Sequence, residues 1–308
     1  MDSWRVIDLS AFAGQVSYRR GQLVVCSNDG ASATIPLADV ATVLLGLNVG
    51  VGPSVLHQLA KFDVITLICG WSGVPSAGMY AWSTHTRVGA RQRAQASMTL
   101  PRRKNAWGQI VRAKVAGQAA NLRHFGSPDW HFLAAMARDV RSGDPNNVEG
   151  RAARYYWARL FVEDEDGFSR CPQGASGRNA LLDYGYAVLR GYGVRAVLSA
   201  GLSSSVGVFH RNRSNAFNLV DDLIEPFRPA IDCVVAGLPV ESSLEDRSVK
   251  EALVESSTQA FTSAGASVAT TLTDLAQQLG RYAEGDIDRL TVPAWSGPQT
   301  QEILEHAS

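Results

Sequence analysis

The feature that most constrains the fold is a change in hydrophobic pattern close to residue 85 of this 308-residue chain. Before this point, apolar residues occur in short runs of strand length, separated by glycine-containing turn signals. After it, apolar residues recur over long stretches at the spacing of one face of a helix. Strands followed by helices, without alternation between them, predict an α+β fold.

The first region, residues 1–85, is predicted to be a small β-rich domain. A hairpin is expected where two strand-like runs flank an Arg-Gly turn, and two later runs are continuously apolar, as in buried strands. A stretch rich in Gly, Ser and Pro, residues 71–78, is expected to end the region. The candidate strands are residues 4–8, 15–19, 22–27, 33–35, 41–45 and 64–69, and the candidate helix is 53–61.

The second region, residues 86–308, is predicted to be a larger all-α domain. One helix is expected to begin at Asp144-Pro145, where an N-cap residue precedes a proline at the first helical position. Another is expected to bend at Pro226 and Pro229. The last 20 residues are expected to fray. The candidate helices are residues 106–123, 129–140, 144–161, 178–200, 218–238 and 247–281.

Several classes of protein are excluded by composition. No apolar run reaches the length of about 18 residues that a membrane span needs. The first residues lack the basic start and cleavage site of a signal peptide, which predicts a cytoplasmic protein. The four cysteines lie far apart without a Cys-x-x-Cys pair, so we expect reduced thiols and no zinc site.

The charge is balanced in total but unevenly distributed. The chain has 29 basic and 29 acidic residues, yet residues 87–124 contain nine Arg or Lys and no Asp or Glu. From residue 240 to the end, four basic residues stand against eleven acidic ones. The basic segment predicts a surface for a polyanion, with an ordinary solvated helix face as the alternative.

Two short motifs match other chemistries by letter only. Gly191-Tyr-Gly-Val-Arg-Ala196 matches the dinucleotide fingerprint, which requires a preceding strand, whereas the residues before it have a helical pattern. Gly201-Leu-Ser-Ser-Ser205 is close to a nucleophile elbow but ends in serine and follows no predicted strand. Neither motif supports a nucleotide-binding or serine-hydrolase function.

An acidic cluster in the helix predicted after residue 218 is the first candidate site. Asp221 and Glu225 are four residues apart and Asp222 lies beside them, so their like charges repel one another on the helix. A divalent cation would relieve this repulsion, since hard cations take carboxylate oxygens. The alternative is a solvated acidic face paired with nearby arginines, namely Arg211, Arg213 or Arg228.

Two further residues favour the metal. His210 lies in the loop that leads directly into the acidic helix, and a neutral imidazole is a good metal ligand, although a packed histidine is the alternative. Glu149 is at the head of an otherwise apolar helix stripe, where the alternative is a favourable interaction with the helix dipole. Together with the acids they predict a Mg²⁺ or Mn²⁺ site for phosphodiester chemistry.

At these residues the chain resembles a known family. Residues 179–190, 200–202 and 208–229, the last ending Asp-Leu-Ile-Glu-Pro-Phe-Arg-Pro, are similar to the CRISPR-associated integrases of spacer acquisition, in the form of the type II branch. The run Asn147-Val-Glu-Gly that contains Glu149 also matches. The resemblance covers most of the chain.

The resemblance implies a fold and a reaction. The β domain would mediate dimerisation and the α-helical domain would be catalytic. Glu149, His210 and Glu225 would be the catalytic and metal-binding residues, with Asp222 as an auxiliary metal ligand. In the implied reaction, the 3′-hydroxyl of a short DNA fragment attacks a phosphodiester of a CRISPR repeat, and branched DNA can also be cut.

The resemblance also implies partners. These are double-stranded DNA (the spacer precursor and the CRISPR repeat), a second copy of the chain, a small CRISPR adaptation protein and the type II effector nuclease. The candidate DNA-binding residues are Arg211, Arg213, Arg228 and Lys114, with the basic segment 87–123 as a wider surface. Two alternatives stay open: a non-catalytic DNA-binding scaffold, and a metallohydrolase of small phosphoesters.

Overall fold

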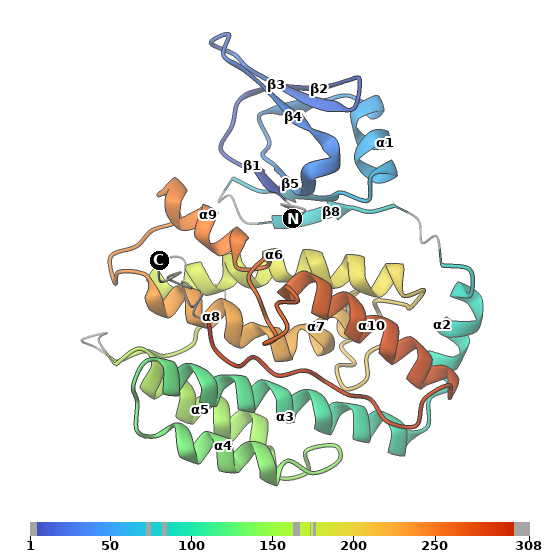
Figure 1. The fold of residues 1–308 in the computed structure, drawn as a ribbon, viewed down its shortest axis with the longest axis vertical. Coiled ribbons are helices and arrows are strands. Elements are labelled where there is room, and N and C mark those ends of the chain that lie inside the picture. Colours follow the sequence, from blue (N-terminus) through green and yellow to red (C-terminus); the bar gives the residue numbers. More distant parts are fainter. Residues whose placement is uncertain are drawn as a thin grey trace, which may run out of the picture.

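A strand-rich part precedes a helical part in the computed structural model, which describes residues 5–71, 75–81, 85–162, 167–172, 174 and 177–298 (Figure 1). All described strands end before residue 80, and every described helix except α1 (Pro53–Lys61) and a short 3-10 turn η1 (Leu37–Asp39) lies after residue 87. The predicted α+β class is therefore confirmed. No described helix is long and apolar enough to cross a membrane.

The N-terminal part consists of two four-stranded sheets. The first contains parallel strands and one antiparallel edge strand; the second contains the predicted hairpin, so that prediction is confirmed. In order across each sheet, the strands are β1 (Arg5–Leu9), β5 (Val40–Leu45), β7 (Ile65–Cys69) and β8 (Pro75–Met79), then β4 (Ser32–Pro36), β3 (Gln22–Ser27), β2 (Gly14–Arg19) and β6 (Val49–Val51).

Strand β8 lies in the stretch that was expected to end the β region and is the last described strand, so that expectation is confirmed; the strand itself was not predicted. Its composition, rich in Gly, Ser and Pro, hides the strand from pattern analysis, because the pairing with β7 and not the side chains defines it.

Strand β5 is buried along its whole length and contributes to two cores. Val43 and Leu45 pack in the smaller core with the second sheet, while Leu44 packs in the larger core with the helices. This alternation follows from the two-residue period of a strand. Because Leu67 and Leu44 share the larger core with the helices, the strands and the helices form one packed unit. The domain boundary at residues 85–86 stays a prediction.

The helical part surrounds α7 and α8, the two helices that flank Glu225. Figure 1 shows α7 and α8 between α6 on one side and α3 on the other. The helices are α2 (Val88–Ala96), α3 (Leu100–His124), α4 (Trp130–Asp139), α5 (Val148–Leu160), α6 (Gly177–Ser199), α7 (Asn218–Ile224), α8 (Arg228–Gly237), α9 (Arg247–Glu255) and α10 (Val268–Glu284). A 3-10 turn, η2 (Glu225–Phe227), joins α7 to α8, which confirms the bend expected at the prolines.

Much of the basic segment 87–123 is directed inward. Arg91 donates to the Ala200 carbonyl at 2.7 Å, and Arg112 donates to the Val140 carbonyl at 2.7 Å. Arg102 donates to two carbonyls, one in the last turn of α10 and one just after that helix. These guanidinium groups hold helices and loops together, whereas Arg87, Arg93, Lys104 and Arg123 are exposed, so the DNA surface on this segment stays a prediction.

The C-terminal stretch up to residue 298 is packed, and fraying is wrong for that part; residues 299–308 lie outside the described residues. Leu290 is fully buried, and Trp295 is 1% exposed and donates from Nε1 to the Asn121 side-chain oxygen at 2.8 Å. The stretch therefore helps to fix α3.

A buried polar network joins α3, α5, α6 and α8. The Tyr156 hydroxyl donates to Asp232 at 3.1 Å, Tyr186 donates to the other oxygen of Asp232, and Asn121 donates to Tyr156 at 2.7 Å. Burial raises the pKa of Asp232 from 3.8 to about 7, and the two tyrosine hydrogen bonds offset this only in part.

Glycines on α6 allow α7 and α8 to approach closely. A Cβ atom at Gly193 would lie 2.7 Å from Val220 Cγ1 and 2.9 Å from Ile224 Cγ2. We expect Gly193→Ala to lower the free energy of unfolding by about 1–3 kcal/mol, because the packed α7 must shift. Urea denaturation measures this. Gly237→Ala is the control, since its Cβ would contact nothing; equal stability of both variants would contradict the packing argument.

The Asp232 carboxyl predicts a pH-dependent stability. Its folded-state pKa is raised, so the stability it contributes is present below about pH 4 and is lost as pH rises through about 7. We expect Asp232→Asn, which has no titrating carboxyl at this position, to reduce the pH-dependent fall in the free energy of unfolding by on the order of a few kcal/mol. Urea denaturation at about pH 5 and about pH 8 compares the two proteins; parallel pH profiles would contradict the assignment.

Candidate metal centre

Two of the expected metal ligands converge on one lysine. The Lys114 ammonium, on α3, lies 2.7 Å from Glu149 Oε1 and 2.6 Å from Glu225 Oε2. The two carboxylates come from α5 and η2, which are far apart in sequence. A positive charge, the Lys114 ammonium, already occupies the position between the two carboxylates.

Glu149 is fixed by the way α5 begins. The N-cap is Asn147, whose side chain accepts from the Gly150 amide at 3.2 Å, and not Asp144 as expected. The Asp144 carboxylate instead caps from outside, since it accepts from the Val148 and Glu149 amides at 2.8 and 2.9 Å. The expected cap position is therefore wrong, but Asp144 still anchors the first turn that carries Glu149.

Glu225 is buried at the bend between α7 and α8, with 3% of its surface exposed. Its Oε1 lies 3.2 Å from the Arg228 guanidinium, three residues further on. Burial by itself would raise the pKa of Glu225, but Arg228 and Lys114 outweigh it and lower that pKa. Glu225 is thus held as a carboxylate.

Lys114 was expected to bind DNA; the structure places it between the two carboxylates, and DNA binding by it stays a prediction. It is 9% exposed and enclosed by the two carboxylates, so it does not present its charge to solvent. Burial would lower the pKa of Lys114, but Glu225 and Glu149 outweigh it and raise that pKa. The side chain is therefore a buried ammonium.

His210 is oriented by Asp222, which is fully buried. Asp222 Oδ1 lies 2.7 Å from His210 Nδ1 and accepts from the His210 amide, while Oδ2 accepts from the Val208 and Phe209 amides at 2.6 and 3.0 Å. When Nδ1 donates to this carboxylate, the neutral ring keeps a lone pair on Nε2 for a ligand. The Asp222 hydrogen bond raises the pKa of His210, against the opposing effect of burial.

The loop before His210 can take this shape only with glycine at residue 207. A Cβ atom there would lie 2.3 Å from the His210 carbonyl oxygen and 2.9 Å from Asp222 Oδ2.

Aromatic rings also pack against His210. Trp107 stacks on Phe209 with ring centroids 4.2 Å apart and meets the His210 ring edge-on with centroids 5.9 Å apart. In this arrangement Asp222 orients His210, and its expected part as an auxiliary metal ligand stays a prediction.

The acidic cluster is buried rather than solvated. Asp221 is 9% exposed and receives two hydrogen bonds from Arg190, at 2.8 and 2.6 Å, and one from Asn215 at 2.7 Å. Of the three arginines expected as partners, Arg228 pairs with Glu225, whereas Arg211 and Arg213 are exposed in the loop after His210. The alternative is therefore wrong in expecting a solvated face but right in expecting arginine partners for the acids.

The donor set fits a hard divalent cation. Among the described residues, no three His, Cys, Asp or Glu side chains are close enough to form a ready-made metal centre. The reason is visible in the geometry, because Lys114 stands between Glu149 and Glu225. Glu225 Oε2 is buried and its one close contact in the described structure is the Lys114 ammonium at 2.6 Å, so the position beside this oxygen already holds a cation.

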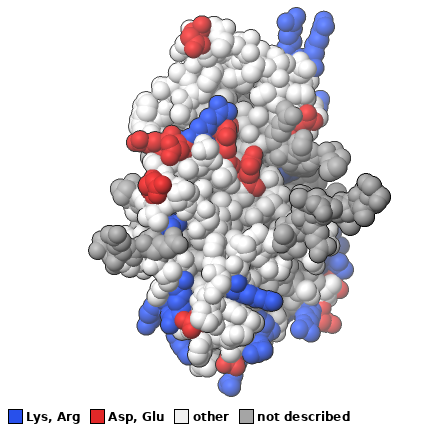
Figure 2. Space-filling model, turned by 60° about the vertical axis from the view of Figure 1, so that its left-hand side comes forward, with Lys and Arg blue, Asp and Glu red and all other residues white. Residues whose placement is uncertain are grey.

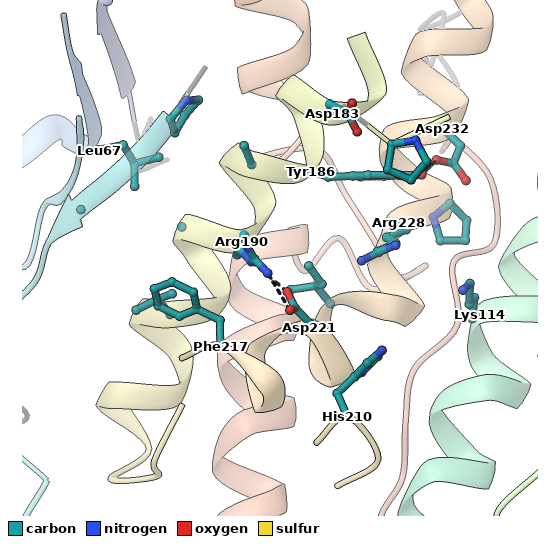
Figure 3. A pocket seen from close by; sticks show the side chains of 18 of the residues that line it. Leu67, Lys114, Asp183, Tyr186, Arg190, His210, Phe217, Asp221, Arg228 and Asp232 are labelled. Carbon is teal, nitrogen blue, oxygen red and sulfur yellow. Dashed lines mark hydrogen bonds and ion pairs between the residues drawn. The ribbon is translucent and has the colours of Figure 1, made fainter. Parts of the chain in front are cut away.

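A cleft of about 610 Å³ extends from His210 and Lys114 toward β8. Figure 3 shows Arg190, Arg228 and His210 pointing into the same space, with Leu67 of β7 on the far wall. Arg170, Tyr186 and Trp157 also line it. Sequence reasoning on charge missed Arg170 and Arg190, because they are separated in sequence from the acidic helix.

Exposed basic side chains also gather at one end of the molecule. Figure 2 shows Lys and Arg at the lower end of the molecule, the end where Figure 1 has α4 and α5. The exposed arginines of these helices and the loop between them are Arg138, Arg141, Arg151 and Arg154. This surface lies outside the basic segment 87–123.

The family model described as CRISPR associated protein Cas1 matches residues 9–257. The CRISPR-associated endonuclease Cas1 of Neisseria meningitidis serogroup C (strain 8013) is 34% identical over 245 residues, which are 79% of this chain and 78% of that protein.

Solved structures have the same fold. A casposase bound to integration product matches with a TM-score of 0.78 and 19% identity, over 94% of both chains. A chain of a Cas6-RT-Cas1–Cas2 complex matches with a TM-score of 0.71 and 17% identity, over 96% of this chain and 36% of that one. The family match covers most of the chain and includes His210, Glu149 and Glu225. This chain therefore belongs to the Cas1 family of CRISPR-associated proteins.

Proposed function

We propose that this chain is a metal-dependent DNA integrase and endonuclease that inserts short DNA spacers into a CRISPR array, as part of antiviral defence. The observation that carries the proposal is the convergence of Glu149 and Glu225 on one cation position, beside His210 and at the end of an arginine-lined cleft. Membership of a family whose relatives are named endonucleases supports the same chemistry.

The proposed metal ligands are Glu149, Glu225 and His210 through Nε2. A bound Mg²⁺ or Mn²⁺ would polarise the scissile phosphate and stabilise charge on the attacking and leaving oxygens. Asp222 holds the imidazole in the orientation that leaves Nε2 free.

The proposed reaction exchanges one phosphodiester for another. The 3′-oxygen of the incoming fragment forms a bond to phosphorus, and the bond from phosphorus to the 3′-oxygen of the repeat breaks and leaves a new hydroxyl. Arg190 and Arg228 line the cleft and would hold neighbouring phosphates, because a guanidinium group matches phosphate oxygens. Arg211 and Arg213 would contact DNA at the rim. With water as the nucleophile, the same centre would cut branched DNA.

The proposed partners are double-stranded DNA, a second copy of the chain, the small adaptation protein Cas2 and the type II effector nuclease. Similarity to a chain of a Cas6-RT-Cas1–Cas2 complex supports Cas2. A dimer through the β region is supported by exposed apolar side chains on β7 and just after it, where Ile68 is 39% and Trp71 is 82% exposed.

Strand joining is the experiment that tests this proposal. A labelled duplex with 3′-hydroxyl ends is incubated with a supercoiled CRISPR plasmid, the protein, Cas2 and Mg²⁺ or Mn²⁺. We expect joining that chelator abolishes and that Glu149→Gln and His210→Ala each reduce by more than about 100-fold, the upper end of outer-shell effects. Glu251→Gln, an exposed glutamate on α9 paired only with exposed Arg247 among the described contacts, is the matched control.

The outcomes separate the alternatives. DNA binding without joining, unaffected by either substitution, would support the non-catalytic scaffold and contradict the proposed function. Hydrolysis of small phosphoesters that DNA does not inhibit would support the third hypothesis.

A further inference from the structure

Lys114 occupies the position where the proposed function requires a metal. Its ammonium is within 2.7 Å of oxygens from both proposed carboxylate ligands and is nearly fully buried. We propose that Lys114 is a displaceable internal cation: it holds Glu149 and Glu225 together before metal binds, gives way to the divalent cation, and moves to the side-chain oxygen of Gln118. This inference rests on the proposed function, because it concerns the same centre.

The metal-free site needs such a charge. Two carboxylates facing each other in a buried place repel one another and have lost their hydration, so an unpaired arrangement is unfavourable. Lys114 relieves both effects, and Arg228 pairs with the remaining oxygen of Glu225. The site is thus assembled in advance, with the acids already placed on either side of a cation.

The ammonium and a metal cannot occupy the same position. Lys114 contacts one oxygen of each carboxylate, so a divalent cation bound to those oxygens would be in direct contact with the ammonium and would repel it. Arg228 contacts Glu225 Oε1, whereas Lys114 contacts Oε2, the oxygen that faces Glu149 across the ammonium. The ammonium and not the guanidinium therefore stands in the way of the metal.

Gln118 provides the second position for the ammonium. It lies one helical turn after Lys114 on α3, and side chains four residues apart on a helix are neighbours. Gln118 is 2% exposed, and its Oε1 is buried without a hydrogen-bond partner in the described structure. A buried amide oxygen that accepts no hydrogen bond is energetically unfavourable. Because the Lys114 side chain is long and has rotatable donors, we infer that Gln118 Oε1 accepts from its ammonium in a second conformation. Both side chains line the cleft, which gives the lysine room to move.

Binding of Mn²⁺ to the full-length protein, measured by calorimetry, tests the inference. We expect Lys114→Met to bind Mn²⁺ at least about tenfold more tightly, because the metal no longer displaces a paired charge. Its melting temperature should fall in chelator and recover in Mn²⁺. Lys104→Met is the matched control, since Lys104 is exposed on the same helix, and it should leave Mn²⁺ binding unchanged.

Gln118→Met is the second variant, and it keeps the ion pairs of Lys114 intact. We expect it to bind Mn²⁺ several-fold more weakly without a lower melting temperature in chelator, because only the metal-bound state loses a hydrogen bond. If Lys114→Met does not fold, this variant decides.

Unchanged or weaker Mn²⁺ binding by folded Lys114→Met overturns the inference, and so does unchanged binding by Gln118→Met. Glu149→Gln distinguishes this failure from that of the proposed function. If the wild-type protein binds no Mn²⁺, or if Glu149→Gln does not weaken binding, the metal centre itself is wrong and the inference falls with it.

Discussion

The interaction on which the site depends is the pairing of Lys114 with Glu149 and Glu225. It joins three elements, α3, α5 and η2, at one buried point. The rest of the helical core serves to bring α3 to this point: Gly117 allows Pro229 and Trp295 to pack within about 3 Å of where a Cβ would lie, and Asn121 bonds to Tyr156 and Trp295. A buried ion pair is weak evidence for stability. Here it brings two carboxylates from elements distant in sequence to one point, and a metal centre needs ligands placed in this way.

A neutral net charge conceals how the charges are used. Arg91, Arg102 and Arg112 hold helices and loops together from within, and Arg190 and Arg228 face the cleft while each pairs with an acid. A cleft with arginines that already have carboxylate partners can exchange those partners for phosphates. The sum of charges therefore says little about whether this fold binds a polyanion.

The sequence predicted the fold class, the bend at η2 and the residues of the candidate centre, because these follow from periodicity, from prolines and from the acids in a recognisable run. It did not predict the position of Lys114, which looks like any lysine of a basic segment until α5 and η2 pack against α3. Nor did it predict that Asp222 would accept four hydrogen bonds around His210. These features are tertiary contacts between residues distant in sequence, so no local pattern contains them.

The most direct test of the central claim is a crystal structure of the protein grown in Mn²⁺, with the metal located by its anomalous scattering. The account predicts an anomalous peak bounded by the carboxylates of Glu149 and Glu225 and by Nε2 of His210, with Lys114 no longer between the two acids. Absence of a peak at this position, with the Lys114 ammonium still bridging Glu149 and Glu225 in the presence of Mn²⁺, would contradict it.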